Sequence, residues 1–586
     1  MESARDTGPA ERLFRRAVWL SLALAVCVNA PSLWIGLVLD DHGHRIFLQT
    51  HLAQRDLGSL AAFDLFDVCG RSGPADIAAR IHSGALPWWA APNLSIAFFR
   101  PFAVFTHYLD YVLWPSSPAL MHAFNIALYL AIVLVVARLY RRLLGVTPLA
   151  ALALLLYAID DAHADGTAWI AGRNTLLCAL FVLLTLLCHD YARRDGSVRA
   201  RWLAVPCLLS ACASGEGAIA VWAYLVPYAW LVDRGSARER IGALAPLAVV
   251  TLAWQWMYRA LGYGVRGGGF YRDPVSDPLG FITQRLPESL PGFLREQLGM
   301  PGLALGLIDA LRSPPALALG ALIAAASLLA FLRLLRGRRD LLFWTCALLG
   351  SLLPPSAAGV TARLLFIPGV AAFVLVAELV LALWTWGKAA LQPALRGSAL
   401  SLAGVLLALH VPVALAFGPL AIWQLWRVEG IVRLSADMLP SGPGSLGKRV
   451  FVLDTPTYFG SLLAPLYRAA SDPPIEMHVL CAAGSHVRLT RRSEDTIVLE
   501  VDHGFLREAT SWLVRAPELR FHEGQLIATG RYVARIEKIT SDGRPLRVSF
   551  QFASLADPHN VFIRWRAPRY EALPLPPVGH VLWVSR

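Results

Sequence analysis

The stretch VWLSLALAVCVNAPSLWIGLVLDDHGH, residues 18–44, decides the class of fold. Residues 18–39 carry no charge, and an apolar helix of about 20 residues is long enough to cross the hydrocarbon core of a bilayer. Three arginines within 12–16 precede the run, and two aspartates end it. We therefore predict a spanning helix that starts on the cytoplasmic side. A cleaved signal peptide ending at VNA (28–30) is the alternative, although the apolar run continues beyond that point.

The composition of the whole chain agrees with a membrane protein. Of 586 residues, 56% are hydrophobic and 16% charged, and the mean hydropathy is +0.51. A water-soluble chain of this size needs more charge on its surface. We predict an all-α polytopic membrane domain over residues 1–430, with about eleven spans. After the first, the candidate spans are 120–137, 143–159, 168–189, 202–215, 217–232, 241–257, 315–332, 341–354, 364–385 and 399–418.

The arginine clusters predict the orientation of these spans, because basic loops stay in the cytoplasm. With the N-terminus inside and eleven crossings, every cluster faces the cytoplasm: 138–142, 193–201, 233–240, 333–339 and 388–396. The same assignment places four segments outside: 40–119, 160–167, 262–314 and everything after about residue 418. We expect an integral, multi-pass protein of a bacterial inner membrane. The net charge of +12 is explained by this topology, so we expect no nucleic-acid partner.

The last part of the chain, residues 431–586, has a different pattern. Alternation of apolar and polar residues with a period of two predicts strands, and turn residues separate them. The predicted strands are 449–454, 486–491, 496–502, 531–539, 546–552, 561–565 and 580–584. We predict a small β-rich domain of sandwich type outside the cytoplasm, in the periplasm.

Asp40 and Asp41 are the first polar residues that look out of place, since they end the first span and open a loop, 40–119, too long for a simple connection. A solvated acidic pair that stops the helix is the structural alternative. The segment DDHGH could also bind a divalent metal, but octahedral oxygen-rich sites need more carboxylates than this. We therefore expect no cofactor, with a divalent metal as the alternative.

Arg100, His107 and Asp110 lie in the aromatic segment FFRPFAVFTHYLDYVLW, residues 98–114, just before the second span. His107 and Asp110 are three residues apart, which predicts that they share one face of a helix. An aromatic belt at the membrane interface with charged anchors is the structural alternative.

Further ionisable residues gather at the predicted outer ends of spans, where they cost free energy unless they have a function or a partner. The segment DDAHADGTAWIAGRN (160–174) contains His163, Asp165 and Arg173, while Glu216 and Arg363 stand alone in apolar surroundings. A buried structural ion pair between such residues is the alternative to a binding site.

The eight cysteines form no CxxC motif, and six of them lie inside or beside apolar runs. Neither a zinc site nor a disulfide framework is indicated. Cys69 and Cys481 are the two in predicted water-exposed regions, and they are the pair that a disulfide would join.

In this order, several of these segments resemble the C-type (GT-C) superfamily of membrane glycosyltransferases. The resemblance is closest to the membrane half of the transmembrane TPR-containing O-mannosyltransferases and their bacterial relatives, and it covers about residues 10–390. The elements that carry it are the DD pair at 40–41, FRP at 99–101, LDYVLW at 109–114, MHAFNIALYL at 121–130, HADGTAWIAGRNTLL at 163–177, SGE at 214–216 and RLLFIPGVAAFVL at 363–375. Gly215 and Ala362 depart from the family pattern, which has lysine and glutamate there, and no TPR repeats follow.

The resemblance implies helices that hold a cavity at the outer leaflet, with a sugar on a polyprenyl phosphate as the donor. It implies an inverting hexosyltransferase whose acceptor is a hydroxyl of a glycan, lipid or protein, with Asp40 as the catalytic base and Asp41 beside it. Arg100, Arg173 and Arg363 are the candidates for binding the donor phosphate, because a guanidinium can contact two phosphate oxygens. His163 and Asp165 would orient the acceptor or these arginines.

Two functions of other classes compete with the enzyme. A lipid or glycan transporter would use the same charged cavity without chemistry, but it favours internal repeats and a site near the membrane midplane. A catalytically inactive relative that serves as a scaffold for assembly of an envelope glycan is favoured by the departures at Gly215 and Ala362.

Overall fold

The computed structural model describes residues 8–298, 314–437, 439, 447–468, 475–483, 486–507, 509–567 and 569–584. The chain forms two compact units. One comprises Met1–Leu37, Phe99–Tyr258 and Leu279–Leu425, and the other Val38–Phe98, Arg259–Pro278 and Trp426–Arg586. The predicted boundary at 430/431 divides the sequence into two continuous parts, whereas the contacts group residues 38–98 of the first loop with the C-terminal part.

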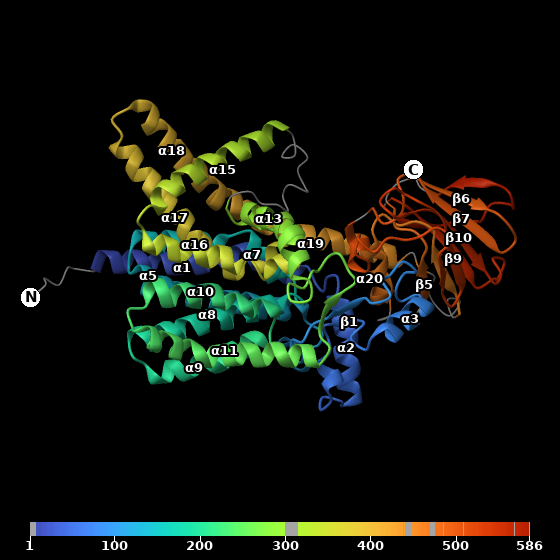
Figure 1. The fold of residues 1–586 in the computed structure, drawn as a ribbon, viewed down its shortest axis with the longest axis horizontal. Helices are drawn as coiled ribbons and strands as arrows, with labels where there is room; N and C mark the ends of the chain where they lie inside the picture. Colours follow the sequence, from blue (N-terminus) through green and yellow to red (C-terminus); the bar gives the residue numbers. More distant parts are fainter. Residues whose placement is uncertain are drawn as a thin grey trace, which may run out of the picture. The chain divides into compact units, whose positions relative to one another are not determined.

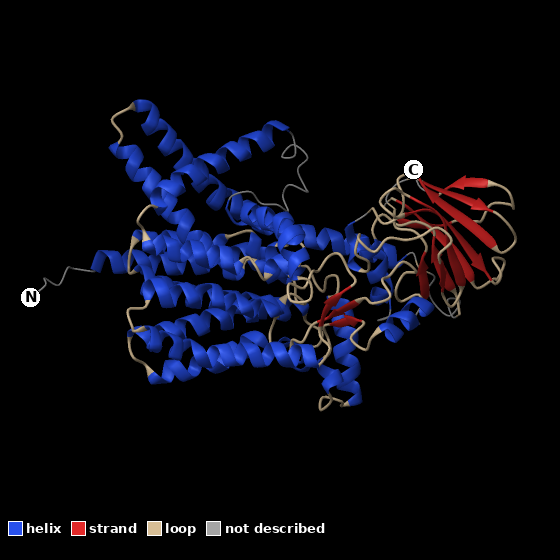
Figure 2. Cartoon of the chain, in the orientation of Figure 1, coloured by secondary structure: helices blue, strands red, loops and turns tan. Residues whose placement is uncertain are grey.

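The first unit is built of helices (Figures 1 and 2). Each predicted span overlaps one of them, since an apolar run in the membrane must form its backbone hydrogen bonds within the segment. The helices are α1 (Gly8–Asn29), α4 (Pro101–Leu113), α5 (Pro118–Leu144), α6 (Pro148–Ile159), α7 (Ala162–Ala168), α8 (Arg173–Arg194), α9 (Val198–Cys212), α10 (Trp222–Pro227), α11 (Ala237–Ala260), α13 (Leu286–Leu298), α15 (Pro314–Leu335), α16 (Arg339–Ser351), α17 (Phe366–Ala389), α18 (Pro393–Ala408) and α19 (Ala414–Asp437).

Seven helical segments of the described residues are long and apolar enough to cross a membrane. They are Gly8–Trp34, Pro118–Leu144, Arg173–Arg194, Ala237–Ala260, Ala318–Leu335, Phe366–Ala389 and Pro393–Asp437. The other four predicted spans coincide with shorter helices, in α6, α9, α16 and the stretch Glu216–Val232. The chain is therefore a multi-pass membrane protein, and the count of eleven spans stays a prediction.

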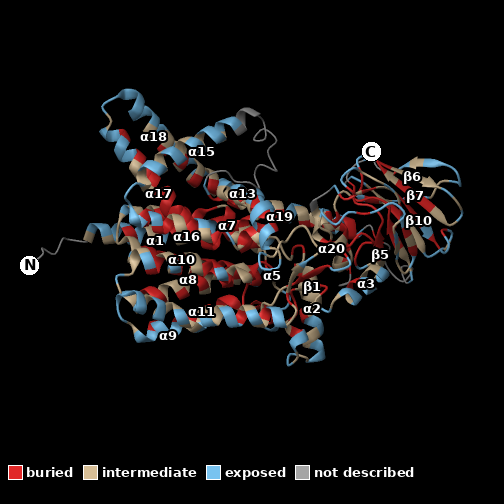
Figure 3. Cartoon of the chain, in the orientation of Figure 1, coloured by how far each residue is buried: buried red, intermediate tan, exposed pale blue. Residues whose placement is uncertain are grey.

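Helix α17 lies at the centre of the first unit, where it packs against α6, α16 and α18. In its most apolar stretch 83% of the residues are buried, whereas the corresponding stretch of α15 has none (Figure 3). An apolar helix with no buried residues has side chains available for lipid. The first unit thus has a protein-packed centre and outer helices suited to a bilayer.

The described residues of the second unit form three sheets. A small sheet joins β1 (Asp67–Cys69), β2 (Ser95–Ala97) and β3 (Gly264–Arg266). The C-terminal part forms an antiparallel sheet of six strands in the order β13-β6-β7-β10-β9-β8 and a sheet of four in the order β12-β11-β4-β5, in which β11, β4 and β5 are parallel. Their bounds are β4 (Arg449–Val452), β5 (Glu476–Val479), β6 (Val487–Arg491), β7 (Thr496–Val501), β8 (Leu526–Ala528), β9 (Tyr532–Ile539), β10 (Pro545–Phe552), β11 (Asn560–Arg566), β12 (Arg569–Ala572) and β13 (Val581–Trp583).

All seven predicted strands are present, and the β-rich character of the C-terminal part is confirmed. Sequence patterns did not indicate β5, β8 and β12, which have only three or four residues, or helix α20 (Tyr458–Arg468), which joins β4 to β5. A right-handed helical crossover is the usual connection between parallel strands of one sheet.

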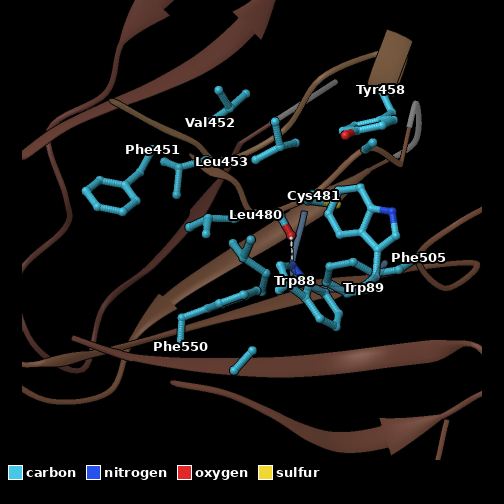
Figure 4. Packing of buried hydrophobic residues seen from close by; sticks show 14 of the residues in the cluster. Trp88, Trp89, Phe451, Val452, Leu453, Tyr458, Leu480, Cys481, Phe505 and Phe550 are labelled. Carbon is cyan, nitrogen blue, oxygen red and sulfur yellow. Dashed lines mark hydrogen bonds between the residues drawn. The ribbon is translucent and has the colours of Figure 1, made fainter. Parts of the chain in front are cut away.

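One apolar core is shared by the two C-terminal sheets and by residues of the first loop. Trp88 and Trp89 lie within it, and the Trp88 indole N–H donates to the Leu480 carbonyl oxygen at 3.0 Å (Figure 4). Cys69 and Cys481 belong to the same core, and both are free thiols. The structure therefore does not form the disulfide that would join this pair.

Candidate active site

Asp40 and Asp41 lie in the second unit, where the chain turns into helix α2 (Asp41–Gln54). Leu39, just before them, has φ = 52°, in the left-handed region that costs a residue with a Cβ about 1–2 kcal/mol. Asp41 is buried, and its Oδ2 accepts the Val38 N–H at 2.9 Å. Asp41 therefore stabilises the turn that presents its neighbour.

Asp40 occupies the N-cap position of α2, where an aspartate usually accepts an N–H of the first helical turn. Its side chain makes no such bond, and its Oδ1 has no hydrogen-bond partner among the described residues. Asp40 is only half-buried, so its carboxylate keeps acceptor capacity that the fold does not use.

Around this turn the structure also places Glu429 and Tyr467, which sequence patterns did not indicate. Glu429 is buried, and its carboxylate accepts the Leu39 N–H. Glu429 lies inside the long apolar helix α19. An acid at such a position was the signal available in the sequence, because acids in such helices are rare unless they are functional or paired.

Arg173, His107 and Asp110 form a buried cluster in the first unit. Nη1 of Arg173 lies 2.5 Å from Oδ2 of Asp110, and Nδ1 of His107 lies 3.8 Å from the same oxygen. The Arg173 guanidinium also donates to Oδ1 of Asn125 at 2.7 Å and to the Thr106 carbonyl oxygen at 3.2 Å. His107 and Asp110 share a face of α4, as their spacing predicts. Arg173 is fully enclosed, and its bonds join α4, α5 and α8.

Arg100 is paired with Glu216, the first residue of the 3-10 helix η3 (Glu216–Val221). Nη2 and Nε of Arg100 lie 2.7 and 3.1 Å from Oε2 of Glu216. Both side chains remain partly exposed. Both residues are predicted to bind substrate, and the structure joins them to each other.

His163 is buried beside the aromatic ring of Phe366, at the start of α17, with the two rings stacked 4.6 Å apart. Its Nδ1 is 3.0 Å from the Tyr129 hydroxyl, and its Nε2 is 3.6 Å from Oδ2 of Asp160. Burial lowers the pKa of His163 to about 3, so the ring is neutral at physiological pH. A neutral imidazole here can orient neighbours through hydrogen bonds but supplies no positive charge for a phosphate.

Asp165 and Arg363 interact electrostatically where α7 contacts the 3-10 helix η8 (Ala362–Leu364). The Arg363 guanidinium lies 4.3 Å from the centre of the Trp169 ring. Among the described residues, no carboxylate oxygen lies within 4.0 Å of it. A cation held on an aromatic face without a carboxylate partner is well suited to an anionic ligand.

Gly166 permits this contact, because a Cβ there would lie 2.7 Å from the Phe366 ring and 3.1 Å from Cβ of Arg363. The glycine of the HADG segment is thus required by close approach. Burial raises the pKa of Asp165, and the nearby Arg363 opposes that rise.

Asp160, Asp161 and Glu296 make a second carboxylate group near α7 that motif comparison did not assign. Burial, with a smaller contribution from Glu296, raises the pKa of Asp161 to about 7. Oδ2 of Asp160 accepts the side-chain N–H of Gln297 at 3.3 Å. Glu296, near the C-terminal end of α13, became relevant only because the fold brings that end of the helix to Asp160, just before α7. In the described residues, no three His, Cys, Asp or Glu side chains are grouped so as to hold a metal ion.

No family model matches the chain. A segment of 119 residues is 32% identical to human protein O-mannosyl-transferase TMTC4, and it covers 18% of this chain and 16% of that protein. The chain resembles the GT-C membrane glycosyltransferases. It matches less than a fifth of the length of that curated relative.

Several solved structures are similar to the chain. The Archaeoglobus fulgidus oligosaccharyltransferase has a TM-score of 0.34 and 11% identity, over 76% of this chain and 63% of its own. ArnT from Cupriavidus metallidurans has a TM-score of 0.33 and 16% identity, over 74% of this chain and 84% of its own. With TM-scores below 0.5, neither structure assigns a role to a residue of this chain.

Proposed function

We propose that the protein is an inverting membrane glycosyltransferase that moves a sugar from a polyprenyl-phosphate donor to an acceptor hydroxyl. The observation that carries the proposal is the state of the DD pair. Asp41 is occupied by the turn, whereas Asp40 has an oxygen that the described residues leave without a partner. A carboxylate with spare acceptor capacity is what a general base requires.

In the proposed step, the acceptor oxygen attacks the anomeric carbon of the sugar while the bond from that carbon to the phosphate oxygen breaks. The proton of the acceptor hydroxyl passes to Asp40. The bonding electrons leave with the polyprenyl phosphate, and a single displacement inverts the configuration. The protein supplies a base, a cation for the leaving phosphate and an orientation for both substrates.

Arg363 is the leading candidate for the phosphate, because it lies on Trp169 without a carboxylate partner within 4.0 Å in the described residues. Arg100 is second, since Glu216 already neutralises it. We assign Arg173, His107 and Asp110 to the structure of the site and not to the phosphate, because their polar groups are buried together. His163 and Asp165 position the helix pair that holds Arg363.

The proposal includes the orientation in the membrane. With eleven spans and a cytoplasmic N-terminus, all five basic clusters lie in the cytoplasm, which supports the proposal. The same topology puts the C-terminal β-rich part outside the cytoplasm. A reporter fused to the C-terminus should be active only if translocated. A cytoplasmic reporter signal would reverse the topology and move the proposed site to the inner face.

The decisive experiment compares Asp40→Asn with Asp41→Asn. Asn at 40 retains size but cannot accept the acceptor's proton, so turnover should fall by about 10²–10⁴-fold. Asn at 41 retains an oxygen for the Val38 N–H and should cost much less. Membranes containing each variant would be given polyprenyl-phosphate mannose that carries a radiolabel in the sugar. Mannose is tested first because the human relative is a protein O-mannosyl-transferase. Other polyprenyl-phosphate hexoses would follow.

Asp56→Asn, at the opposite end of α2, is the matched control and should retain parental turnover. A second measurement is accumulation of polyprenyl-linked sugar in a deletion strain complemented with each variant. If the protein is required but neither Asp40→Asn nor Asp41→Asn alters sugar transfer, the enzyme proposal fails and a scaffold or transporter takes its place.

A further inference from the structure

The strained turn before Asp40 is held by side chains from a distant part of the sequence. Leu39 is buried and left-handed, and helix capping does not explain it, unlike Arg55 at the C-terminal end of α2. Strained residues persist when their surroundings fix them, and they concentrate at functional sites. The groups that fix Leu39 are therefore informative about Asp40.

Two side chains converge on the Leu39 N–H. The Tyr467 hydroxyl accepts it at 3.0 Å, and Oε2 of Glu429 lies 3.2 Å from the same nitrogen. The Tyr467 hydroxyl in turn donates to Glu429. Glu429 lies near the C-terminal end of α19, and Tyr467 lies on α20 of the β-rich part.

His42 completes the arrangement on the other side of Asp40 and Asp41. Its Nε2 is 3.3 Å from Oε1 of Glu429, and its ring stacks on Tyr467 with centres 3.9 Å apart. The same two side chains therefore hold the residue before the DD pair and the residue after it. Among the described residues, neither side chain forms a hydrogen bond with Asp40, so their effect on Asp40 passes through the backbone.

We infer that Glu429 and Tyr467 are positioning residues for catalysis, which hold Leu39 in its left-handed conformation and so fix the direction of the Asp40 carboxylate. The inference rests on the proposed function and gives the C-terminal part a role in the reaction. Without the two groups, Leu39 relaxes toward negative φ, and Asp40 turns away from the acceptor. A misplacement of about 1 Å can cost about 10²-fold in rate.

The test measures kcat and KM for polyprenyl-phosphate hexose with Tyr467→Phe and Glu429→Gln. We expect kcat to fall about 10-fold for Tyr467→Phe and up to about 10²-fold for Glu429→Gln, with KM for the donor nearly unchanged, because positioning acts in the transition state. Glu429→Gln retains the volume of the side chain, so the fold is preserved better than in Glu429→Ala.

Matched controls come from the same unit. Tyr570→Phe removes a buried hydroxyl that bonds Thr455 and Ser461, and Glu476→Gln removes a carboxylate paired with Arg531. Both should lower thermal stability about as much as the test variants, with kcat close to parental. A loss of kcat that tracked stability equally in all four variants would overturn the inference.

A rescue experiment separates positioning from packing. Glycine adopts positive φ without the Cβ penalty, so Leu39→Gly makes the left-handed turn less dependent on its clamps. Tyr467→Phe should therefore reduce kcat less in the Leu39→Gly background than in the parent. An equal reduction in both backgrounds would contradict a role through Leu39.

Asp40→Asn, measured in parallel, separates this inference from the proposed function. If Asp40→Asn stops transfer while Tyr467→Phe and Glu429→Gln behave like their controls, the positioning role is wrong and the enzyme stands. If Asp40→Asn has no effect either, the proposed function itself fails, and the inference falls with it.

Discussion

Arg173 and Arg363 are both arginines at the predicted outer start of a helix, yet their surroundings differ in kind. Arg173 is fully buried and bonds Asp110, Asn125 and two backbone carbonyl oxygens. Arg363 is partly exposed and lies on the face of Trp169. The first guanidinium is bound to the protein, whereas the second is available to an anion.

The comparison shows that an arginine near the membrane can be stabilised in two ways. A buried arginine needs a partner, and removing the partner costs more than the pair contributes. An arginine on an aromatic face is stabilised without losing its capacity for phosphate. Mutation should therefore affect folding at one arginine and activity at the other.

Arg173→Ala should have the largest effect, because it leaves the Asp110 carboxylate buried without its cation. We expect a loss of about 3–5 kcal/mol of stability, enough to reduce folded protein in the membrane. Thermal unfolding in detergent measures this loss. The double variant Arg173→Met with Asp110→Leu should recover much of it, and no recovery would show that Arg173 has a role beyond the ion pair.

Arg363→Ala should instead lower donor turnover by about 10²–10³-fold, the range for loss of one charge-stabilising donor. Arg363→Lys should lose less, since it keeps the charge but not the planar fork. Stability should change by only about 0.5–1 kcal/mol, the value of an exposed cation–π contact. Arg338→Ala, which removes a cation paired with Asp340, is the control. Parental turnover in both Arg363 variants would make Arg363 a structural residue at the end of a helix.

Gly166→Ala tests whether the position of Arg363 depends on the contact between α7 and η8. The added methyl would meet the Phe366 ring at 2.7 Å, so overpacking should cost about 1–3 kcal/mol and reduce turnover. At Gly242 a Cβ meets nothing within 4 Å, so Gly242→Ala should have neither effect. If the two variants unfolded and turned over donor alike, the position of Arg363 would not depend on the contact between α7 and η8.

The smallest effect concerns pH. Because the pKa of Asp161 rises from 3.8 to about 7, the folded protein binds a proton more tightly than the unfolded chain. The contribution of Asp161 to stability should fall as pH rises from about 4 to 7 and then level off. Asp161→Asn should remove that dependence and raise stability by about 1–2 kcal/mol at pH 8. Glu296→Gln should shift the window toward lower pH, and unfolding curves across pH that are parallel for parent and variants would contradict both expectations.

Much of the fold follows from local pattern. The apolar runs predict the helices of the first unit, and alternation predicts seven strands of the second, because period and length are properties of consecutive residues. The alternating pattern does not predict the short strands β5, β8 and β12. Their pairing is determined by neighbours far away in the sequence, as when β4 pairs with β5 on one side and β11 on the other.

The candidate site divides in the same way. The positions of Asp40, Arg173 and Arg363 stand out in the sequence, since a charge beside an apolar run is costly and therefore conspicuous. Which of these groups already has a partner depends on residues from other helices, such as Asp110 for Arg173. The sequence did not indicate Glu429 and Tyr467, because their role depends on the hydrogen bonds that they accept from the Leu39 N–H.

By itself, the sequence determines that this protein crosses a membrane, that its last part is β-rich and that its ionisable groups gather at the ends of helices. These properties follow from the free-energy cost of placing charges and unpaired backbone groups in hydrocarbon. That cost depends on the residues of each segment and not on its neighbours in the fold. Only the tertiary structure decides that Asp41 stabilises a turn while Asp40 keeps its acceptor capacity, and that Arg173 is enclosed while Arg363 is not. A hydrogen bond or ion pair needs two groups within about 3–4 Å, and packing alone brings residues from different helices to that distance.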